Sequence, residues 1–464
     1  MTHDSTICAI STPSGTGAIA VIRISGSDAI TICESVFQPV TSGKKLSMQK
    51  QNTFHFGTFA VEGRVIDEVI VGIFRAPASY TGEDMAEISC HGSVYIQNEI
   101  MKLLLKSGAQ TACPGEFTMR AFLNGKIDLS QAEGVADLIS SGSEAAHRIA
   151  LQQMRGGFSE EINDLRNRLL HFTSLIELEL DFSEEDVEFA DREQLRSLVA
   201  EVSTMIKRLV CSFDLGNVLK TGVPVAIAGE PNVGKSTLLN ALLNEERAIV
   251  TDIAGTTRDY IEDSITINGI LFRFIDTAGI RDARDKIESR GIELAFRKIS
   301  EAKIVIFIVE ATSAVDKIAA SFHKFKEHIK GQKVIIAINK TDLPGAFHDL
   351  PSKLLPFTAN TPVIKISAKH RTNLDSLISE LMNPLHLSDY HSEDIIVTNA
   401  RHYEALKKAG EAIDRVLPGL DQAIPGDLLA QDIREALHYL GEITGQITTD
   451  EVLQNIFRNF CIGK

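Results

Sequence analysis

The sequence is poor in features that would fix its class at once. It has no tryptophan and only six cysteines in 464 residues, and no two cysteines form a C-x-x-C pair. This excludes a disulfide framework, because a chain of this length does not need covalent staples. The first residues, M-T-H-D-S-T, lack the basic and apolar regions of a signal peptide, and the apolar run 304–309 is far too short to span a bilayer. We therefore expect a cytoplasmic protein with reduced thiols and no membrane contact.

The sequence also lacks an excess of positive charge. Its net charge is −15 and its pI about 5.4, which argues against a general polyanion binder but allows a local basic site. Nearly all the net acidity lies in 125–221 and 385–464, and it is densest over 177–193. Solvated helix faces or a docking surface for a basic partner would both explain it. The length and the ordinary 44% hydrophobic content predict roughly two to four soluble domains.

The most informative stretch that is present is 229–236, which reads G-E-P-N-V-G-K-S, a phosphate-binding P-loop. It follows a strand-like run, 223–228, and precedes a helical one, 237–243, as the motif requires. Backbone N–H groups of such a loop and the helix N-terminus point at phosphates. Lys235 supplies a point charge for the β- and γ-phosphates, and Ser236 offers a hydroxyl to Mg²⁺.

Further loops in the expected order support a nucleotide site. G-T-T-R-D begins at 255 after a loop-like stretch 244–254, and D-T-A-G (276–279), N-K-T-D (339–342) and S-A-K (367–369) each follow a predicted strand. The carboxylate of Asp342 can accept from two donors on guanine, which adenine lacks, so GTP is the predicted nucleotide. The predicted nucleotide-binding residues are Asn232, Val233, Gly234, Lys235, Ser236, Thr237, Thr251, Asp252, Ile253, Ala254, Gly255, Thr256, Thr257, Asp276, Thr277, Ala278, Gly279, Asn339, Lys340, Thr341, Asp342, Ser367, Ala368 and Lys369.

The region before the P-loop divides into two patterns. Residues 1–124 predict a mixed α+β domain, with strands at 7–10, 18–24, 53–61, 68–75 and 86–89 and a helix at 93–106. Polar clusters at 81–84 and 114–118 are unusual for a scaffold. Cys90 and His91 could suggest a nucleophile and its base, but neighbours in a strand point to opposite faces and do not easily meet.

From residue 129 the pattern becomes helical on both sides of the GTPase unit. Helices are expected at 130–139, with a capping box at 130–133, at 144–180, 192–211 and 399–417, from Pro425 to Leu440, and after a second capping box at 448–451. We therefore predict a multidomain chain. It has an α+β domain (1–124) and an all-α helical domain (125–221 and 385–464), with an inserted α/β P-loop GTPase domain of the Ras-like type (222–384). Within the last, 261–275 predicts a hairpin turning at Asn268-Gly269 in type I′ geometry.

The motifs and their order resemble the bacterial and organellar tRNA-modification GTPase family called MnmE or TrmE. The specific markers are S-G-T-G-A-I-A-V-I-R-I-S-G near the start, P-G-E-F-T-M-R-A-F-L-N-G-K-I-D-L-S-Q-A-E at 114–133, G-T-T-R-D, and the ending C-I-G-K. The resemblance covers essentially the whole chain. Without it, the sequence would indicate only a GTPase of unknown output.

The resemblance implies a one-carbon transfer. In the family, the N-terminal domain dimerises and binds the donor 5-formyltetrahydrofolate. With the FAD- and NADH-using partner MnmG (GidA), in a heterotetramer, a carboxymethylaminomethyl-type group is placed on carbon 5 of the wobble uridine of certain tRNAs. Matching positions put Arg23, Glu87, Lys126 and Lys464 near the folate, where cations can meet carboxylates and Glu87 can accept from the pterin. Cys461 is open to two interpretations, a nucleophile near the folate or a packed tail residue.

The residue after D-T-A-G is Ile280, where small signalling GTPases carry a water-positioning glutamine. A nearby acid or amide must orient the water instead, and the next segment offers Asp282, Asp285 and Glu288. The family favours Glu288, so Glu288 and Lys235 are the predicted catalytic residues. The family also implies a K⁺ ion in place of an arginine finger, with ligands from Asn232, Thr251, Ile253 and Thr256, and Mg²⁺ held by Ser236 and Thr257.

Two other classes compete with this interpretation. A ribosome-assembly GTPase switch of the Era type shares the P-loop and G-T-T-R-D. Such proteins typically append a Lys- and Arg-rich RNA-binding domain, whereas the tail here is acidic and helical. A stand-alone folate enzyme would leave the GTPase unexplained.

Overall fold

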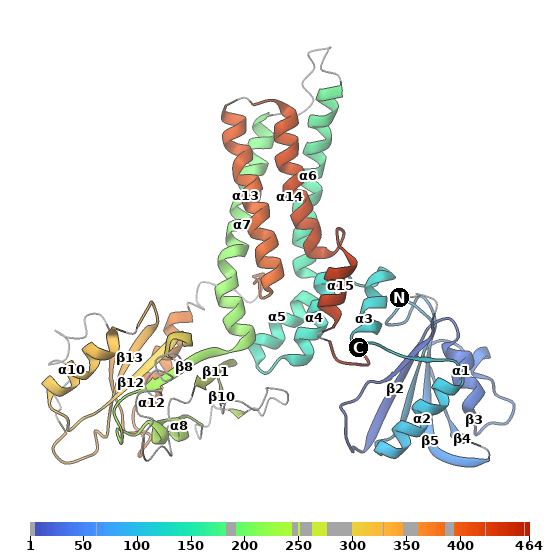
Figure 1. The fold of residues 1–464 in the computed structure, drawn as a ribbon, viewed down its shortest axis with the longest axis horizontal. Coiled ribbons are helices and arrows are strands. Elements are labelled where there is room, and N and C mark those ends of the chain that lie inside the picture. The colour runs from blue at the N-terminus through green and yellow to red at the C-terminus, as the bar shows by residue number, and fades with distance from the viewer. Residues whose placement is uncertain are drawn as a thin grey trace. The chain divides into compact units, whose positions relative to one another are not determined.

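The computed structural model describes residues 5–61, 63–181, 192–243, 249–250, 262–275, 299–327, 329–346, 361–385, 394–422, 424–458 and 460–464. Figure 1 shows its helices and strands. The chain forms two compact units. The first consists of Met1–Ile139, Leu151–Ser203 and Lys408–Lys464, and the second of Ser140–Ala150 and Thr204–Lys407. The finer boundaries predicted at 124, 221 and 384 stay predictions.

In the first unit, seven strands of the described residues form one sheet in the order β3-β4-β5-β6-β2-β1-β7, antiparallel except for the β1–β7 pair. The strands are β1 (Ile7–Ile10), β2 (Ile19–Ser25), β3 (Phe37–Pro39), β4 (Thr53–Val61), β5 (Arg64–Phe74), β6 (Met85–His91) and β7 (Gln110–Thr111). The predicted strands are all present, although β5 begins at Arg64 rather than Glu68. The first residues of β5 do not alternate regularly between apolar and polar side chains, so its start could not be predicted from the pattern.

Alternation gives this sheet one covered and one open face. Residues such as Ile22, Ile24 and Ile88 pack in a core with α1 (Ala29–Val36) and α2 (Val94–Lys106), near a short 3₁₀ turn at Leu46–Met48. On the opposite face, Phe54 and Phe56 of β4 stay largely exposed, as does Ile70, which pairs with Phe56. The sheet thus carries an apolar surface, the Phe54–Phe56–Ile70 patch, that its own helices do not cover.

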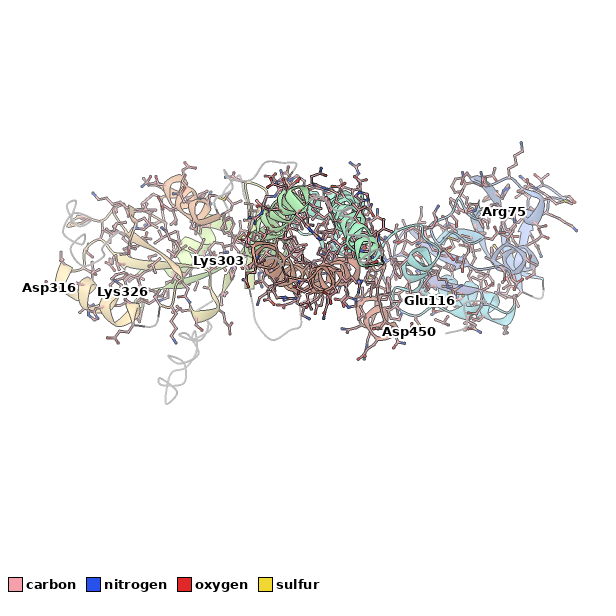
Figure 2. The ribbon with its side chains drawn as sticks, turned by 90° about the horizontal axis from the view of Figure 1, so that it is seen from above. Arg75, Glu116, Lys303, Asp316, Lys326 and Asp450 are labelled. Carbon is pink, nitrogen blue, oxygen red and sulfur yellow. The ribbon has the colours of Figure 1, made fainter. Side chains whose placement is uncertain are left out.

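The rest of the first unit is helical. The helices that lie in it wholly or in part are α3 (Glu116–Leu123), α4 (Leu129–Ser140), α5 (Glu144–Met154), α6 (Gly157–Asp181), α7 (Arg192–Thr221), α13 (Ala400–Asp421), α14 (Gly426–Thr444) and α15 (Asp450–Phe457). Figure 2 looks down the bundle of α6, α7, α13 and α14. Charged pairs tie the bundle together, among them Arg168–Glu201 between α6 and α7 and Arg434–Glu177 between α14 and α6.

Several predicted helix boundaries were wrong, each for a local reason. The run 144–180 is two helices, because the chain turns at Gly156 with φ of 92°. The capping box of α4 is formed by Asp128 and Gln131, whose backbone N–H groups each donate to the other's side chain at 2.9 Å, and not by Ser130 and Glu133. The box predicted at 448–451 is also absent in the described structure.

The last two helices begin one residue later than expected. Thr449 caps α15 by accepting from the N–H of Val452, whose side chain cannot reciprocate. Pro425 is the N-cap residue of α14 rather than its first helical residue, and the helix continues to Thr444 instead of Leu440. At α15 the neighbouring Thr448 and Thr449 can both cap a helix, and the path of the chain selects Thr449.

In the second unit, the described strands form a mostly parallel sheet in the order β14-β13-β12-β8-β11-β10-β9. The strands are β8 (Val223–Ala228), β9 (Ile249–Val250), β10 (Glu262–Ile267), β11 (Ile270–Ile275), β12 (Ile304–Glu310), β13 (Lys333–Asn339) and β14 (Val363–Lys365). The short β9 lies in a stretch expected to be loop. The hairpin β10–β11 is confirmed, with φ of 50° at Asn268 and 79° at Gly269, as a type I′ turn requires.

Helices cover both faces of this sheet. Leu238 of α8 (Lys235–Leu243) and Leu377 of α12 (Leu374–Met382) join one core, near a 3₁₀ turn at Asn383–Leu385, and Phe322 of α10 (Val315–Lys326) joins the other. Strand β12 is therefore buried on both faces and reads I-V-I-F-I-V. The fold is a doubly covered α/β unit whose parallel strands end at one edge. Among the described helices, none is long and apolar enough to cross a membrane.

Candidate functional site

The P-loop connects β8 to α8 through residues in left-handed or otherwise glycine-type conformations. Gly229, Asn232 and Gly234 have φ of 154°, 64° and 102°. A Cβ on Gly229 would lie 2.3 Å from the carbonyl oxygen of Ile308, and one on Gly234 would lie 2.3 Å from Nδ2 of Asn339. The glycines are needed here because neighbouring loops approach the backbone closely. These conformations let the loop pass close to Ile308 and Asn339 before α8 begins at Lys235.

Lys235 is the first residue of α8, and its side chain folds back over the loop. Its Nζ donates to the carbonyl oxygens of Gly229 and Glu230 at 2.8 and 2.9 Å. The ammonium is thus held beside the loop backbone, where it adds positive charge to the N-terminal end of the helix dipole. This arrangement can bind a phosphate chain.

Asn339 connects three of the predicted loops. Its side chain, 2% exposed, donates through Nδ2 to the carbonyl oxygen of Val233 at 2.9 Å. Its Oδ1 accepts from the backbone N–H of Ala368, also at 2.9 Å. One amide thereby fixes the P-loop, N-K-T-D and S-A-K to one another. They meet because β8, β13 and β14 are parallel strands ending at the same edge of the sheet.

Asp342 is anchored from the S-A-K loop. Ser367 donates from Oγ to Oδ1 of Asp342 at 2.6 Å, and Nε2 of His370 lies 3.5 Å from the other carboxylate oxygen. The hydroxyl of Ser367 lowers the pKa of Asp342 below its ordinary value. Asp342 therefore stays an ionised acceptor, and Ser367 has a supporting role that the tripeptide pattern alone does not reveal.

Other predicted nucleotide residues lie outside the described structure. They are Thr251, Asp252, Ile253, Ala254, Gly255, Thr256, Thr257, Asp276, Thr277, Ala278, Gly279 and Glu288. The described members, in the P-loop, N-K-T-D and S-A-K, converge at one edge of the sheet, and the contacts of Asn339 and Asp342 join them.

A second polar site lies on the sheet of the first unit. Arg23 and Glu87 are paired across β2 and β6, and Nε and Nη2 of Arg23 donate to Oε1 of Glu87 at 3.0 and 2.8 Å. The guanidinium also lies over the rings of Tyr80 and Phe117, 5.3 and 5.7 Å from their centroids. The ion pair therefore has a hydrogen-bonded side and an aromatic side.

The end of the chain completes this second site. The carbonyl oxygen of Gly463 accepts from Nη1 of Arg23 at 3.3 Å and from Oγ of Ser11 at 3.1 Å. Partial burial, and then the charge of Arg23, lower the pKa of Lys464. The structure thus brings together Arg23, Glu87 and the C-terminal tail.

Two other residues singled out in the sequence lie apart from those contacts. Lys126 is exposed and donates from Nζ to the carbonyl oxygen of Pro77 at 2.9 Å. Cys461 is exposed, and its own carbonyl accepts from the N–H of Lys464. The structure thus holds Cys461 in a turn of the tail and leaves its thiol accessible.

A buried network that the sequence patterns did not reveal is connected to the second site through β2, the strand that carries Arg23. Arg120 of α3, 4% exposed, donates to both carboxylate oxygens of Glu83 at 3.2 Å and to Glu116 at 2.9 Å. Glu83 also accepts from Ser25 of β2 at 2.7 Å. Glu116 is labelled in Figure 2. The polar clusters at 81–84 and 114–118 therefore belong to one structural network, because the guanidinium of Arg120 pairs with a carboxylate from each.

Cys90 and His91 do not form a catalytic pair. Cys90 is buried at 4% exposure, and burial raises the pKa of its thiol to about 11. His91 points outward and contacts Asp67 through Nδ1 at 2.7 Å. The expectation that strand alternation separates them is confirmed.

Comparison with known proteins gives consistent matches along the chain. Residues 6–126 match a model described as "GTP-binding protein TrmE N-terminus", and residues 129–461 match one described as "MnmE helical domain". A protein of Bacteroides thetaiotaomicron named "tRNA modification GTPase MnmE" is 56% identical over the whole of both chains. One of the same name from Flavobacterium johnsoniae is 53% identical, again over the whole of both. A crystal structure of Aquifex aeolicus Era is 28% identical over 41% of this chain and 66% of Era, with a TM-score of 0.27.

Proposed function

The chain belongs to the MnmE family of tRNA modification GTPases, and from that premise we propose that it couples GTP hydrolysis to a one-carbon transfer onto tRNA. The chain is a GTP hydrolase, as its full-length relatives are. The transfer would place a carboxymethylaminomethyl-type group on carbon 5 of the wobble uridine of certain tRNAs. The Era-type alternative is not retained, because relatives named for tRNA modification match the entire chain.

The observation that carries the nucleotide assignment is the side chain of Asn339. It bonds to the P-loop at Val233 and to the S-A-K loop at Ala368, so the phosphate-binding and base-binding parts form one rigid edge. Asp342, held by Ser367, can accept from two donors of a guanine base. Lys235 can offset negative charge on the phosphates, and P-loop N–H groups can donate hydrogen bonds to them.

The described candidate ion ligands fit the oxygen chemistry of Mg²⁺ and K⁺. Ser236 lies at the start of α8, suited to Mg²⁺ together with Thr257, and Asn232 is exposed at the tip of the P-loop. Thr251, Ile253 and Thr256 would complete a K⁺ site with Asn232. Bound there, K⁺ supplies the positive charge that an arginine finger supplies in other GTPases. Glu288 is the proposed acid that orients the attacking water, because Ile280 has no polar side-chain atom.

The second polar site suits 5-formyltetrahydrofolate. Arg23 and Lys464 offer cationic donors to carboxylate or formyl oxygens, and Glu87 can accept from the pterin edge. Tyr80 and Phe117 add aromatic surface beside Arg23. Lys126 is a further proposed contact. The buried Arg120 network supports this proposal because it fixes the strands and helix that carry the site.

The proposed assembly is a homodimer that joins MnmG in a heterotetramer. The Phe54–Phe56–Ile70 patch supports dimerisation, because exposed apolar surface of this kind is usually covered by a partner. The acidic segments 125–221 and 385–464 suit a basic partner or solvent equally.

Ion dependence tests the GTPase part of this proposal. Hydrolysis is expected to require K⁺ or an ion of similar radius, with Na⁺ inactive. The substitution Asn232→Ala should remove the dependence and most of the rate, since roughly several kcal/mol of transition-state stabilisation can come from a charge placed there. Hydrolysis rates measured in KCl and NaCl at matched ionic strength decide it. Equal rates in the two salts would contradict the proposal.

Equilibrium binding of 5-formyltetrahydrofolate to the full chain tests the second part. Glu87→Gln replaces one acceptor oxygen with an NH₂ donor, which cannot accept from the donors of the pterin. The affinity for 5-formyltetrahydrofolate should therefore fall about 10-fold or more. Glu99→Gln is the matched control, because Glu99 pairs with Lys102 on the exposed side of α2. Equal affinity of wild type and Glu87→Gln would exclude Glu87 from the site.

A further inference from the structure

Lys340, the second residue of N-K-T-D, has a strained backbone. Its φ is 64°, a left-handed conformation that asparagine and glycine adopt far more readily than lysine. Such conformations cost roughly 1 kcal/mol or more and persist where surrounding contacts fix them, often at functional sites. Backbone hydrogen bonds hold it there, since the carbonyl oxygen of Lys340 accepts from the N–H of Leu343 at 3.2 Å and the N–H of Thr341 donates to Ile366 at 3.4 Å.

The side chain of Lys340 is held by Glu310. Nζ of Lys340 lies 2.8 Å from Oε2 of Glu310, and both side chains are roughly seven-tenths buried, 31% and 27% exposed. The other carboxylate oxygen accepts from the hydroxyl of Thr312 at 2.7 Å. Glu310 is thus held from two sides. The hydrogen bond from Lys340, followed by that from Thr312, lowers the pKa of Glu310 and keeps it ionised.

The backbone places Glu310 beside the nucleotide edge. It is the last residue of β12 and pairs with Asn339, the last residue of β13. The next residue, Ala311, donates its N–H to the carbonyl oxygen of Asn339 at 2.8 Å. Lys340 therefore lies between Asn339, which reaches the P-loop, and Asp342, which would bind the base.

We propose that Glu310 is a positioning residue for the guanine nucleotide, which holds the ammonium of Lys340 so that its methylene stem is presented to the purine. The inference deepens the GTP-binding function proposed above and rests on it. A lysine stem can lie along a flat apolar surface while its charged end stays in a polar environment, and here Glu310 sets where that end lies. Without Glu310, the ammonium is free to leave and the stem loses its fixed position.

The test measures binding of a fluorescent GDP analogue to the full chain, together with single-turnover GTP hydrolysis at saturation. Glu310→Ala should weaken GDP binding about 10-fold, chiefly through faster dissociation. Glu310→Gln, which keeps an acceptor but loses the charge, should weaken it less. The hydrolysis rate at saturating GTP should stay within about twofold of wild type, because Glu310 positions substrate and does not touch the reacting atoms.

A charge-swapped double variant separates positioning from mere stabilisation of the fold. Glu310→Lys combined with Lys340→Glu restores an ion pair but not the lysine stem. If Glu310 acts by positioning Lys340, the double variant should bind nucleotide weakly even though its thermal unfolding midpoint returns to that of wild type. Wild-type affinity in Glu310→Ala, or affinity restored by the swap, would overturn the proposal.

Two controls complete the experiment. Glu327→Gln breaks the exposed contact of Glu327 with His323 on α10 and should change neither affinity nor rate. Asp342→Asn tests whether guanine nucleotides bind at this edge at all. If Asp342→Asn weakens GDP binding while Glu310→Ala does not, the GTP site stands and the role of Glu310 fails.

Discussion

At the scale of single residues, burial divides the six cysteines into two chemical groups. Burial raises the thiol pKa of Cys8 and Cys90 to about 11 and that of Cys33 to about 12. Cys113, Cys211 and Cys461 are exposed. The reactive species is the thiolate. At pH 8, only about one thousandth of a thiol with a pKa near 11 is present as thiolate.

We therefore predict that an aromatic disulfide reagent at pH 8 titrates three thiols of the native chain quickly and all six after denaturation. Raising the pH should bring the buried thiols into reaction only as it approaches their raised pKa values. Peptide mapping of the labelled chain would identify the sites. Fast native labelling of Cys33 would contradict the burial that the structure gives it.

A second residue-scale prediction concerns Asp342. Replacing it with asparagine leaves a donor facing the donors of guanine, so GTP affinity should fall by about 2–3 kcal/mol. Xanthosine triphosphate offers an acceptor at that position, and its binding should be relatively spared. Competition between the two nucleotides on one sample measures both effects. Unchanged preference for GTP in Asp342→Asn would move base recognition to another group.

At the scale of elements, the hairpin β10–β11 contacts α5 within the second unit. The N–H of Ala145 donates to the carbonyl oxygen of Gly269 at 3.0 Å. A Cβ on Gly269 would lie 3.1 Å from Oε2 and 3.3 Å from Cβ of Glu144. The hairpin turn therefore needs glycine twice, for its φ of 79° and for the approach of α5.

Gly269→Ala should accordingly lower the free energy of unfolding by about 1 kcal/mol for backbone strain, plus a further amount for displacing Glu144. Gly63→Ala is the control, because Gly63 has nearly the same φ, 80°, with open space around it. Thermal unfolding followed by circular dichroism should show the larger shift for Gly269→Ala. Adding Glu144→Ala should reduce the difference. Identical shifts for the two single variants would mean that α5 does not crowd the turn.

At the scale of the whole molecule, the two ends of the chain build one site. Gly463 reaches Ser11 and Arg23, residues more than 400 positions away in sequence. It does so with φ of 91°, and a Cβ there would lie 2.6 Å from the carbonyl oxygen of Ile10. The tail is thus fixed by a close backbone approach that only glycine allows.

Gly463→Ala should release the tail while leaving the rest of the first unit folded. Carboxypeptidase should then remove the last residues several times faster than from wild type, because cleavage follows the population of the open state. Gly43→Ala, with φ of 78° and no neighbours within 4 Å, controls for strain alone. Mass spectrometry over time gives the rates, and a wild-type rate in Gly463→Ala would show that the tail contact is weak.

Features that depend on short stretches of chain could be predicted from the sequence. The P-loop, the type I′ hairpin, the strands β1 and β4 and the α/β character of residues 223–385 follow from local turn chemistry and from alternation. The separation of Cys90 from His91 follows from strand geometry alone. Helix starts were harder, because Asp128 and Ser130, or Thr448 and Thr449, can each cap a helix.

Contacts between residues far apart in the chain could not be predicted in this way. Three sets of contacts depend on the order of parallel strands in the sheet. They are the hydrogen bonds of Asn339 to two loops, of Ser367 to Asp342 and of Lys340 to Glu310. The Arg120 network and the docking of Gly463 on Arg23 depend on how α3 and the tail pack against strands. Periodicity specifies which face of an element is buried but not which element covers it, so these contacts required the fold.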